Sequence, residues 1–149
     1  MNGWLLDTNV IAELSKRQAA ARVAAWVAAQ DEATLFLSIL TLGEYEKGLA
    51  NLPLEDPRRG MIAAGIAALE ARFAGRVLSL TDSIVRRWGA IGGLLEMRTR
   101  QTPPVIDTML AATAIEHDLC LVTRNVRAVR WSGAALLNPW EESDPTCAC

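Results

Sequence analysis

The sequence lacks the features that mark secreted and membrane proteins. Its three cysteines, Cys120, Cys147 and Cys149, are too few and too badly placed for a disulfide framework, which fits a reducing compartment. The longest apolar run, Met61 to Leu69, is far shorter than the roughly 18 residues that a membrane span needs. The first residues carry neither the basic region nor the cleavage site of a secretory signal. We therefore expect a cytoplasmic protein without membrane contact.

The sequence also lacks an excess of positive charge. Fifteen Lys and Arg against 17 Asp and Glu give a net charge of −2, so no global basic field indicates nucleic-acid binding. A local basic patch is still compatible with this balance. Lys16 and Lys47 are the only lysines, and every other cation is an arginine. Arginine binds phosphate or carboxylate with two parallel hydrogen bonds, although GC-rich coding produces the same bias.

What the sequence does contain is the composition of one folded domain. Its 149 residues are 51% hydrophobic and 21% charged, which is typical of a globular domain and excludes disordered and low-complexity classes. We expect a single domain over residues 1–140. From Glu141 to Cys149 the chain is polar and interrupted by proline, which predicts a loose tail.

Short apolar runs alternate with helical patterns along the chain. Strands are expected at Gly3–Leu6, Leu35–Leu37, Val77–Leu80 and Leu119–Val122, with a possible fifth at Leu136–Leu137. Helices are expected directly after Asp7, over Ala19–Ala29, from Ser38 to before Pro53, over Pro57–Phe73, from Thr81 or Asp82 to near Arg100, and over Val105–His117. This alternation predicts an α/β fold with a mostly parallel sheet of four to five strands and helices on both faces.

Polar side chains follow the strands at the edge where an open parallel sheet binds its ligands. Asp7 follows the first strand, Ser38 the second with Glu44 further along its helix, and Thr123 to Asn125 the fourth. Asp107 lies in the first turn of the helix before the fourth strand, on the same face as small core residues. We therefore expect these acids to converge.

Each acid also has a structural interpretation. Asp7 can cap the first helix, Asp107 can interact with a helix dipole, and Glu44 can lie on an exposed helix face. Together, however, three carboxylates without matching cations would raise one another's pKa unless a divalent ion neutralised them. Oxygen ligands without histidine or cysteine suit Mg²⁺ or Mn²⁺ better than zinc.

The ordered motifs resemble those of PIN-domain ribonucleases. They are Leu6-Asp7-Thr8-Asn9-Val10-Ile11, Ser38-x-x-Thr41-x-x-Glu44, Asp107-x-x-x-Ala111-Ala112-Thr113-Ala114 and Leu121-Val122-Thr123-Arg124-Asn125, and the closing Asn138-Pro139-Trp140 resembles the VapC toxins of toxin–antitoxin pairs. The resemblance covers nearly the whole chain. It implies a PIN-like three-layer domain that acts as an endoribonuclease toxin.

The resemblance also implies roles for individual residues. Asp7, Glu44 and Asp107 match the acids of the family, with Thr8 and Thr123 as the hydroxyls beside them. Asp7 and Asp107 would bind Mg²⁺ or Mn²⁺, while Glu44 would bind it or orient the water that attacks the RNA phosphodiester. Many relatives carry a fourth acid where Asn125 stands here. An amide adds no negative charge, so we expect one firmly held metal ion and a second only with substrate.

Partners follow from the same resemblance. The RNA substrate, of the tRNA or ribosomal RNA class, could contact a rim of arginines formed by Arg98, Arg100, Arg124, Arg127 and Arg130, or these could be an ordinary solvated face. A cognate antitoxin and a homodimer or toxin–antitoxin hetero-oligomer are implied by family. The apolar faces of Ala19–Ala29 and Leu40–Ala50 could receive an antitoxin helix, although core packing explains them equally well.

Two other functions remain open at this stage. One is a catalytically weak PIN-fold module that binds RNA or protein, with Asn125 marking the lost activity. The other is a phosphatase-like hydrolase with Asp7 as its nucleophile, but no second acid stands two residues further on. A glycine-rich dinucleotide fingerprint and a P-loop lysine motif are both missing from the sequence.

Overall fold

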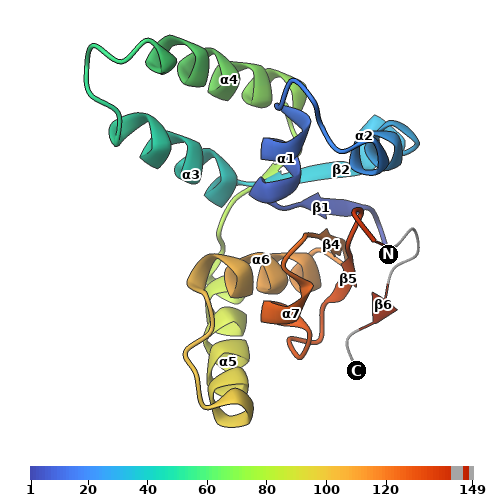
Figure 1. Ribbon diagram of the computed structural model, residues 1–149. Coiled ribbons are helices and arrows are strands. Elements are labelled where there is room, and N and C mark those ends of the chain that lie inside the picture. The colour runs from blue at the N-terminus through green and yellow to red at the C-terminus, as the bar shows by residue number, and fades with distance from the viewer. Residues whose placement is uncertain (142–145, 148–149) are drawn as a thin grey trace.

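The computed structural model describes residues 1–141 and 146–147. Strands alternate with helices as the sequence predicted (Figure 1). The elements in chain order are β1 (Trp4–Leu6), α1 (Thr8–Leu14), α2 (Ala21–Ala28), the 3₁₀ turn η1 (Glu32–Thr34), β2 (Leu35–Ser38), α3 (Ile39–Ala50), α4 (Arg58–Arg72), β3 (Val77–Leu78), α5 (Asp82–Thr99), α6 (Val105–Glu116), β4 (Cys120–Val122), α7 (Val126–Val129), β5 (Ala135–Leu137) and β6 (Thr146–Cys147).

The strands form one sheet in the order β3-β2-β1-β4-β5-β6. The first five strands of this order are parallel, and β6 pairs antiparallel with β5. The mostly parallel α/β sheet is therefore confirmed, with one more strand than predicted. The sixth strand lies within the segment from Glu141 that we expected to be a loose tail, and residues 142–145 and 148–149, including Cys149, lie outside the described part.

Successive residues of each strand point to opposite faces of the sheet and enter different cores. Leu6 packs in one buried cluster with residues of α1 and α2, including Val23 and Val27. Leu5 packs in a second cluster with residues of α6 and α7. Helices therefore cover both faces, which gives the three layers predicted for the domain. The apolar stripe of α2 packs in the core, so core packing rather than binding of an antitoxin helix explains that face.

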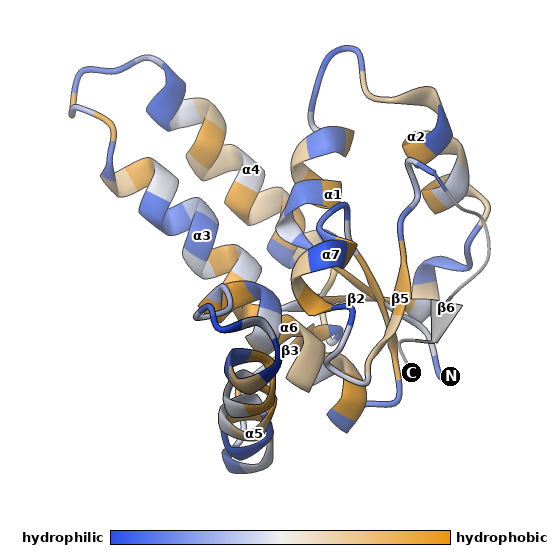
Figure 2. Cartoon of the chain, turned by 60° about the horizontal axis from the view of Figure 1, so that its bottom comes forward, coloured by the Kyte–Doolittle hydropathy of each residue, from blue (hydrophilic) through white to orange (hydrophobic). Residues whose placement is uncertain are grey.

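A third cluster joins α5 to α6 beside the second face of the sheet. Ile84, Ile91 and Leu95 of α5 pack on Met109 and Ala112 of α6. Helices α3 and α4 project from the sheet as a pair, which Figures 1 and 2 both show. In Figure 2 the strands are mostly coloured as hydrophobic, whereas the projecting helices mix both colours. None of the described helices has the length and apolar composition to cross a membrane.

Candidate active site at the carboxyl edge of the sheet

Asp7 and Thr123 meet because their strands are neighbours. Leu6 of β1 lies in register with Val122 of β4, so the residue after each strand reaches the same edge. Thr123 Oγ1 donates a hydrogen bond of 2.6 Å to Asp7 Oδ2, and Asn9 Nδ2 donates one of 2.8 Å to the same oxygen. Although Asp7 occupies the N-cap position of α1, its carboxylate is thus bound by side chains. It is only 5% exposed.

Glu44 is held at this edge by the first residue of α1. Thr8 Oγ1 donates a hydrogen bond to Glu44 Oε2, and it also lies 3.0 Å from Thr41 Oγ1. Ser38, at the N-cap of α3, accepts a hydrogen bond from the amide of Leu40, which fixes the start of the helix that carries Glu44. Glu44 is half-buried, so the interpretation as a freely exposed surface acid is wrong.

Asp107 is paired with the residue that replaces the fourth acid. Asn125 Nδ2 donates a 2.7 Å hydrogen bond to Asp107 Oδ2, and the Asn125 amide nitrogen donates to Thr123 Oγ1 at 3.0 Å. The side chain and backbone of Asn125 therefore connect Asp107 to the Thr123–Asp7 pair. Asp107 stands in the first turn of α6, as predicted.

The acids at this edge influence one another electrostatically. Burial raises the pKa of Asp7 above its ordinary value, and the hydrogen bond from Thr123 acts in the opposite direction. Burial also raises the pKa of Asp107, and the negative charges of Asp7 and Glu44 raise it further. Within the described part of the chain, no ion pair with Lys or Arg compensates any of these three carboxylates.

This arrangement fits a divalent cation in its chemistry, because the donor atoms are oxygens that repel one another. It differs from the predicted convergence in one respect. Among the described residues, no three Asp, Glu, His or Cys side chains gather closely enough to hold a metal ion. The hydrogen bonds of Thr8 to Glu44 and of Asn125 to Asp107 fix two of the acids separately. Asp7 and Asp107 would hold the cation, because the negative charge of Asp7 raises the pKa of Asp107 and a cation would neutralise both.

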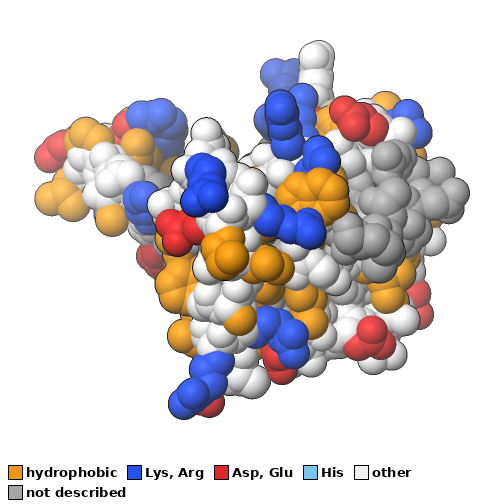
Figure 3. Space-filling model, turned by 90° about the horizontal axis from the view of Figure 1, so that it is seen from below, with side chains coloured by type: hydrophobic (Ala, Val, Ile, Leu, Met, Phe, Trp, Pro, Cys, Tyr) orange, Lys and Arg blue, Asp and Glu red, His pale blue; other side chains and the backbone are white. Residues whose placement is uncertain are grey.

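The predicted arginine rim is divided between two aromatic side chains. The guanidinium carbons of Arg98 and Arg130 lie 5.0 and 4.3 Å from the ring centre of Trp131, and that of Arg124 lies 5.2 Å from Trp140. Arg127 lines a cavity together with Asn125, next to Asp107. Figure 3 shows Lys and Arg side chains gathered beside hydrophobic ones on one face of the molecule.

Arg100 does not join the arginines that stack on aromatic rings. It is the C-cap of α5 and adopts a left-handed conformation with φ of 60°. Its left-handed backbone ends the helix, and non-glycine residues are uncommon in this conformation. Its side chain is exposed. The predicted end of α5 near Arg100 is confirmed.

Two further residues of the sequence motifs, Asn9 and Thr41, contact the site, although the motifs predicted no role for them. Asn9 donates to Asp7 and Thr123, and its Oδ1 accepts a 3.3 Å hydrogen bond from the amide of Arg124. Thr41 lies next to Thr8 and is buried. No helical period signals Asn9, because residues two apart on a helix do not face each other. Its contact with Asp7 depends on the extended backbone of Asp7 at the N-cap of α1.

Comparisons with known proteins agree with this fold. Residues 4–132 match the family model described as PIN domain. The chain is 34% identical over 140 residues to VapC ribonuclease Y4jK of Sinorhizobium fredii, covering 92% of this chain and 97% of that protein. It is 29% identical over 139 residues to Toxin FitB of Neisseria gonorrhoeae, covering 93% and 99%.

The solved structures agree as well. The crystal structure of FitAcB from Neisseria gonorrhoeae matches with a TM-score of 0.82 at 28% identity, over 93% of this chain and 99% of that one. The family predicted from the ordered motifs is thus confirmed. The chain belongs to the PIN domain family, in the group that includes VapC ribonuclease Y4jK.

Proposed function

We propose that the protein is a Mg²⁺- or Mn²⁺-dependent endoribonuclease and the toxin of a toxin–antitoxin pair. The observation that supports this most is the group of acids at the carboxyl edge of the sheet. Asp7 and Asp107 both have raised pKa values, and the negative charges of Asp7 and Glu44 contribute to the rise in the pKa of Asp107. Carboxylates whose negative charges raise one another's pKa are stabilised by a divalent cation.

The division of labour follows from the hydrogen bonds. Thr123 and Asn9 both donate to Asp7 Oδ2, and Asn125 donates to Asp107 Oδ2, so these hydrogen bonds orient the two acids that would hold the cation. Glu44, fixed by Thr8, orients the attacking water. A divalent cation at this site supplies Lewis-acid activation of water and neutralises charge on the phosphate.

The proposed reaction is hydrolysis of an RNA phosphodiester. The water oxygen forms a bond to phosphorus, and the bond from phosphorus to the 3′ oxygen breaks. The products therefore carry a 5′-phosphate and a 3′-hydroxyl. Asp7 and Asp107 would act as ligands, Thr123 positions Asp7, and Asn125 positions Asp107. Thr8 positions Glu44, and Arg124 and Arg127 contact the RNA backbone.

An antitoxin is the proposed protein partner. FitB is named as a toxin, and the fold matches FitAcB over nearly the whole chain. By analogy we propose that this chain binds a cognate antitoxin and assembles as a homodimer or a toxin–antitoxin hetero-oligomer. Co-expression of the neighbouring open reading frame with the tagged toxin, followed by mass measurement of the intact complex, tests this.

The activity test compares Asp7→Asn with a matched aspartate variant. Asp118 lies before β4 at the opposite edge of the sheet, has an exposed side chain and adopts φ of 51°, a conformation that asparagine tolerates. Purified tRNA and ribosomal RNA are incubated with each protein in Mg²⁺, Mn²⁺ or EDTA, and the 5′-phosphate ends are sequenced. We expect discrete ends from the wild type and Asp118→Asn in either metal, and none from Asp7→Asn.

One observation favours a second candidate function. Asn125 gives the site one negative charge fewer than a four-acid site and occupies an oxygen of Asp107. A PIN-fold module that binds RNA or protein without cutting it would tolerate this. If the folded wild type cuts neither RNA in any metal but still binds RNA, the binding module replaces the nuclease.

A further inference from the structure

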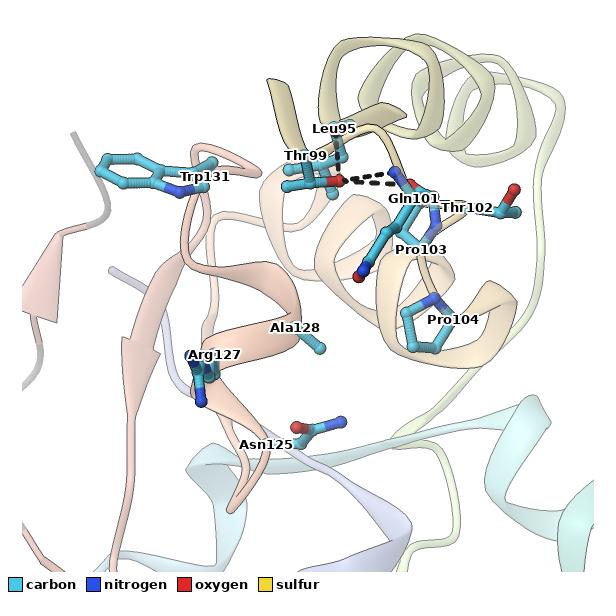
Figure 4. A pocket seen from close by; sticks show the side chains of 10 residues that line it. All are labelled: Leu95, Thr99, Gln101, Thr102, Pro103, Pro104, Asn125, Arg127, Ala128 and Trp131. Atoms are coloured by element: carbon cyan, nitrogen blue, oxygen red, sulfur yellow. Dashed lines mark hydrogen bonds between the residues drawn. The ribbon is translucent and has the colours of Figure 1, made fainter. Parts of the chain in front are cut away.

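A cavity of about 400 Å³ opens beside the acids, and the acids themselves do not line it. Its walls come from the end of α5, the loop between α5 and α6, and α7 (Figure 4). Its volume lies within the range of natural ligand sites, which is roughly 300 to 1,000 Å³. It suits one small planar group and is too small for a duplex.

The cavity is continuous with the proposed active site through one residue. Asn125 lines the cavity and donates its side-chain hydrogen bond to Asp107. A ligand in the cavity would contact Asn125, which separates it from the proposed metal ligand Asp107 by one hydrogen bond. The cavity therefore adjoins the side of the proposed active site that Asn125 forms.

The walls combine apolar surface with one amide and one cation. Pro103, Pro104 and Ala128 supply apolar faces, and in Figure 4 the side chain of Gln101 points into the space between α7 and the α5–α6 loop. Arg127 is the one charged side chain among the described lining residues. An apolar wall accepts the flat face of a base, and a glutamine amide offers one donor group and one acceptor to the base edge.

The rim of the cavity adds charge of the sign that RNA requires. Trp131 lines the cavity, packs on the α5–α6 cluster and carries the guanidinium groups of Arg98 and Arg130 over its ring. Stacking on Trp131 orients these arginines without neutralising them. A phosphodiester backbone that passes along the rim would thus meet Arg127 and these two further arginines.

We propose that this cavity binds one unpaired nucleotide of the RNA, adjacent to the scissile phosphodiester, and that Gln101 reads its base. The proposal rests on the ribonuclease function proposed above. Gln101 is then a residue that determines cleavage specificity rather than a catalytic residue. RNA-binding proteins commonly read unpaired bases in this way, because stacking and edge contacts are both accessible only outside a duplex.

The test measures base preference around the cut. A pool of short RNAs with randomised sequence is digested in Mn²⁺ by the wild type, Gln101→Ala and Gln30→Ala, and the cleavage sites are sequenced. Gln30 is a matched glutamine between α2 and η1, at the opposite end of the strands. Its side-chain Nε2 donates a hydrogen bond to the carbonyl oxygen of Trp26. We expect the preference at one position beside the cut to fall roughly tenfold in Gln101→Ala only. An unchanged preference in Gln101→Ala overturns the proposal while leaving the nuclease function intact.

A binding measurement separates this proposal from the function on which it rests. Asp7→Asn protein is titrated with the same RNA pool, and the side-chain amide of Gln101 and the indole of Trp131 are followed by NMR. We expect both signals to shift and the Gln30 amide to stay. If the wild type fails to cut, the nuclease function is wrong, and the NMR titration alone decides the cavity: no shift at Gln101 overturns it.

Discussion

The uncompensated acids predict that a divalent cation stabilises the fold. A carboxylate whose folded-state pKa is raised contributes no penalty below its ordinary pKa of about 3.8. The fold loses stability as the pH rises above this value, and the loss is complete once the pH exceeds the raised pKa. Asp7 and Asp107 therefore both cost stability at neutral pH. A cation that binds them only in the folded protein removes this cost and adds its own binding free energy.

The magnitude follows from linkage. At a free cation concentration of 100 times Kd, the stabilisation is about 2.7 kcal/mol. For a domain of this size, 1 kcal/mol shifts Tm by roughly 2–4 °C, so we expect Mn²⁺ to raise Tm by roughly 5–11 °C. The measurement is thermal unfolding by circular dichroism at pH 7.5, in EDTA and over a Mn²⁺ series.

The Asp7→Asn variant sharpens this prediction. Asparagine can still accept the hydrogen bonds from Asn9 and Thr123, but it has no charge to desolvate. We expect Asp7→Asn to be more stable than the wild type in EDTA, to lose most of the Mn²⁺ shift, and to lose part of its sensitivity to pH above 4. Asp118→Asn is the control. If Asp7→Asn is less stable than the wild type in EDTA, or if Mn²⁺ does not change the Tm of the wild type, the acids do not form a cation site that stabilises the fold.

Three further predictions concern the surroundings of the acids. Asn125→Asp restores a fourth acid, so we expect calorimetric titration to detect a second Mn²⁺ and the Tm in EDTA to fall. Arg124→Ala removes a phosphate contact, so the slope of log K for RNA binding against log salt should fall by about 0.7, whereas Arg86→Gln should leave it unchanged. Thr123→Val removes the hydroxyl that donates to Asp7, so we expect a loss of about 1–2 kcal/mol in denaturant unfolding and a weaker Mn²⁺ shift. An unaltered Mn²⁺ shift in Thr123→Val would show that this hydroxyl does not position Asp7.

The sequence predicted the long helices well, because their apolar residues recur at helical spacing over several turns. The helix expected over Val105–His117 is α6 at Val105–Glu116, and the helix expected over Pro57–Phe73 is α4 at Arg58–Arg72. The third strand is shorter than Val77–Leu80, because Ser79 and Leu80 are exposed beyond the last pairing with β2. The four-residue α7 and two-residue β6 were missed since such short elements contain no measurable period.

The site was predictable as far as sheet topology determines it. Asp7 and Thr123 follow paired neighbouring strands, so their contact follows from strand order. The separate fixing of Glu44 by Thr8 depends on how α3 leaves the sheet, which no local pattern specifies. The cavity beside Asn125 was not predicted, because its walls are brought together by the packing of α5 on α6.

The metal dependence of the proposed nuclease is measured by a metal add-back titration of RNA cleavage. Wild-type protein and Asp107→Asn are stripped with EDTA, and the initial rate of cleavage is measured as Mn²⁺ is returned. We expect no cleavage before Mn²⁺ is added, a saturable rise in the wild type, and a rate at least a hundredfold lower, on the order of the loss of a catalytic metal ligand, in Asp107→Asn. Cleavage by the wild type that persists in EDTA, or equal rates in the two proteins, would contradict this expectation.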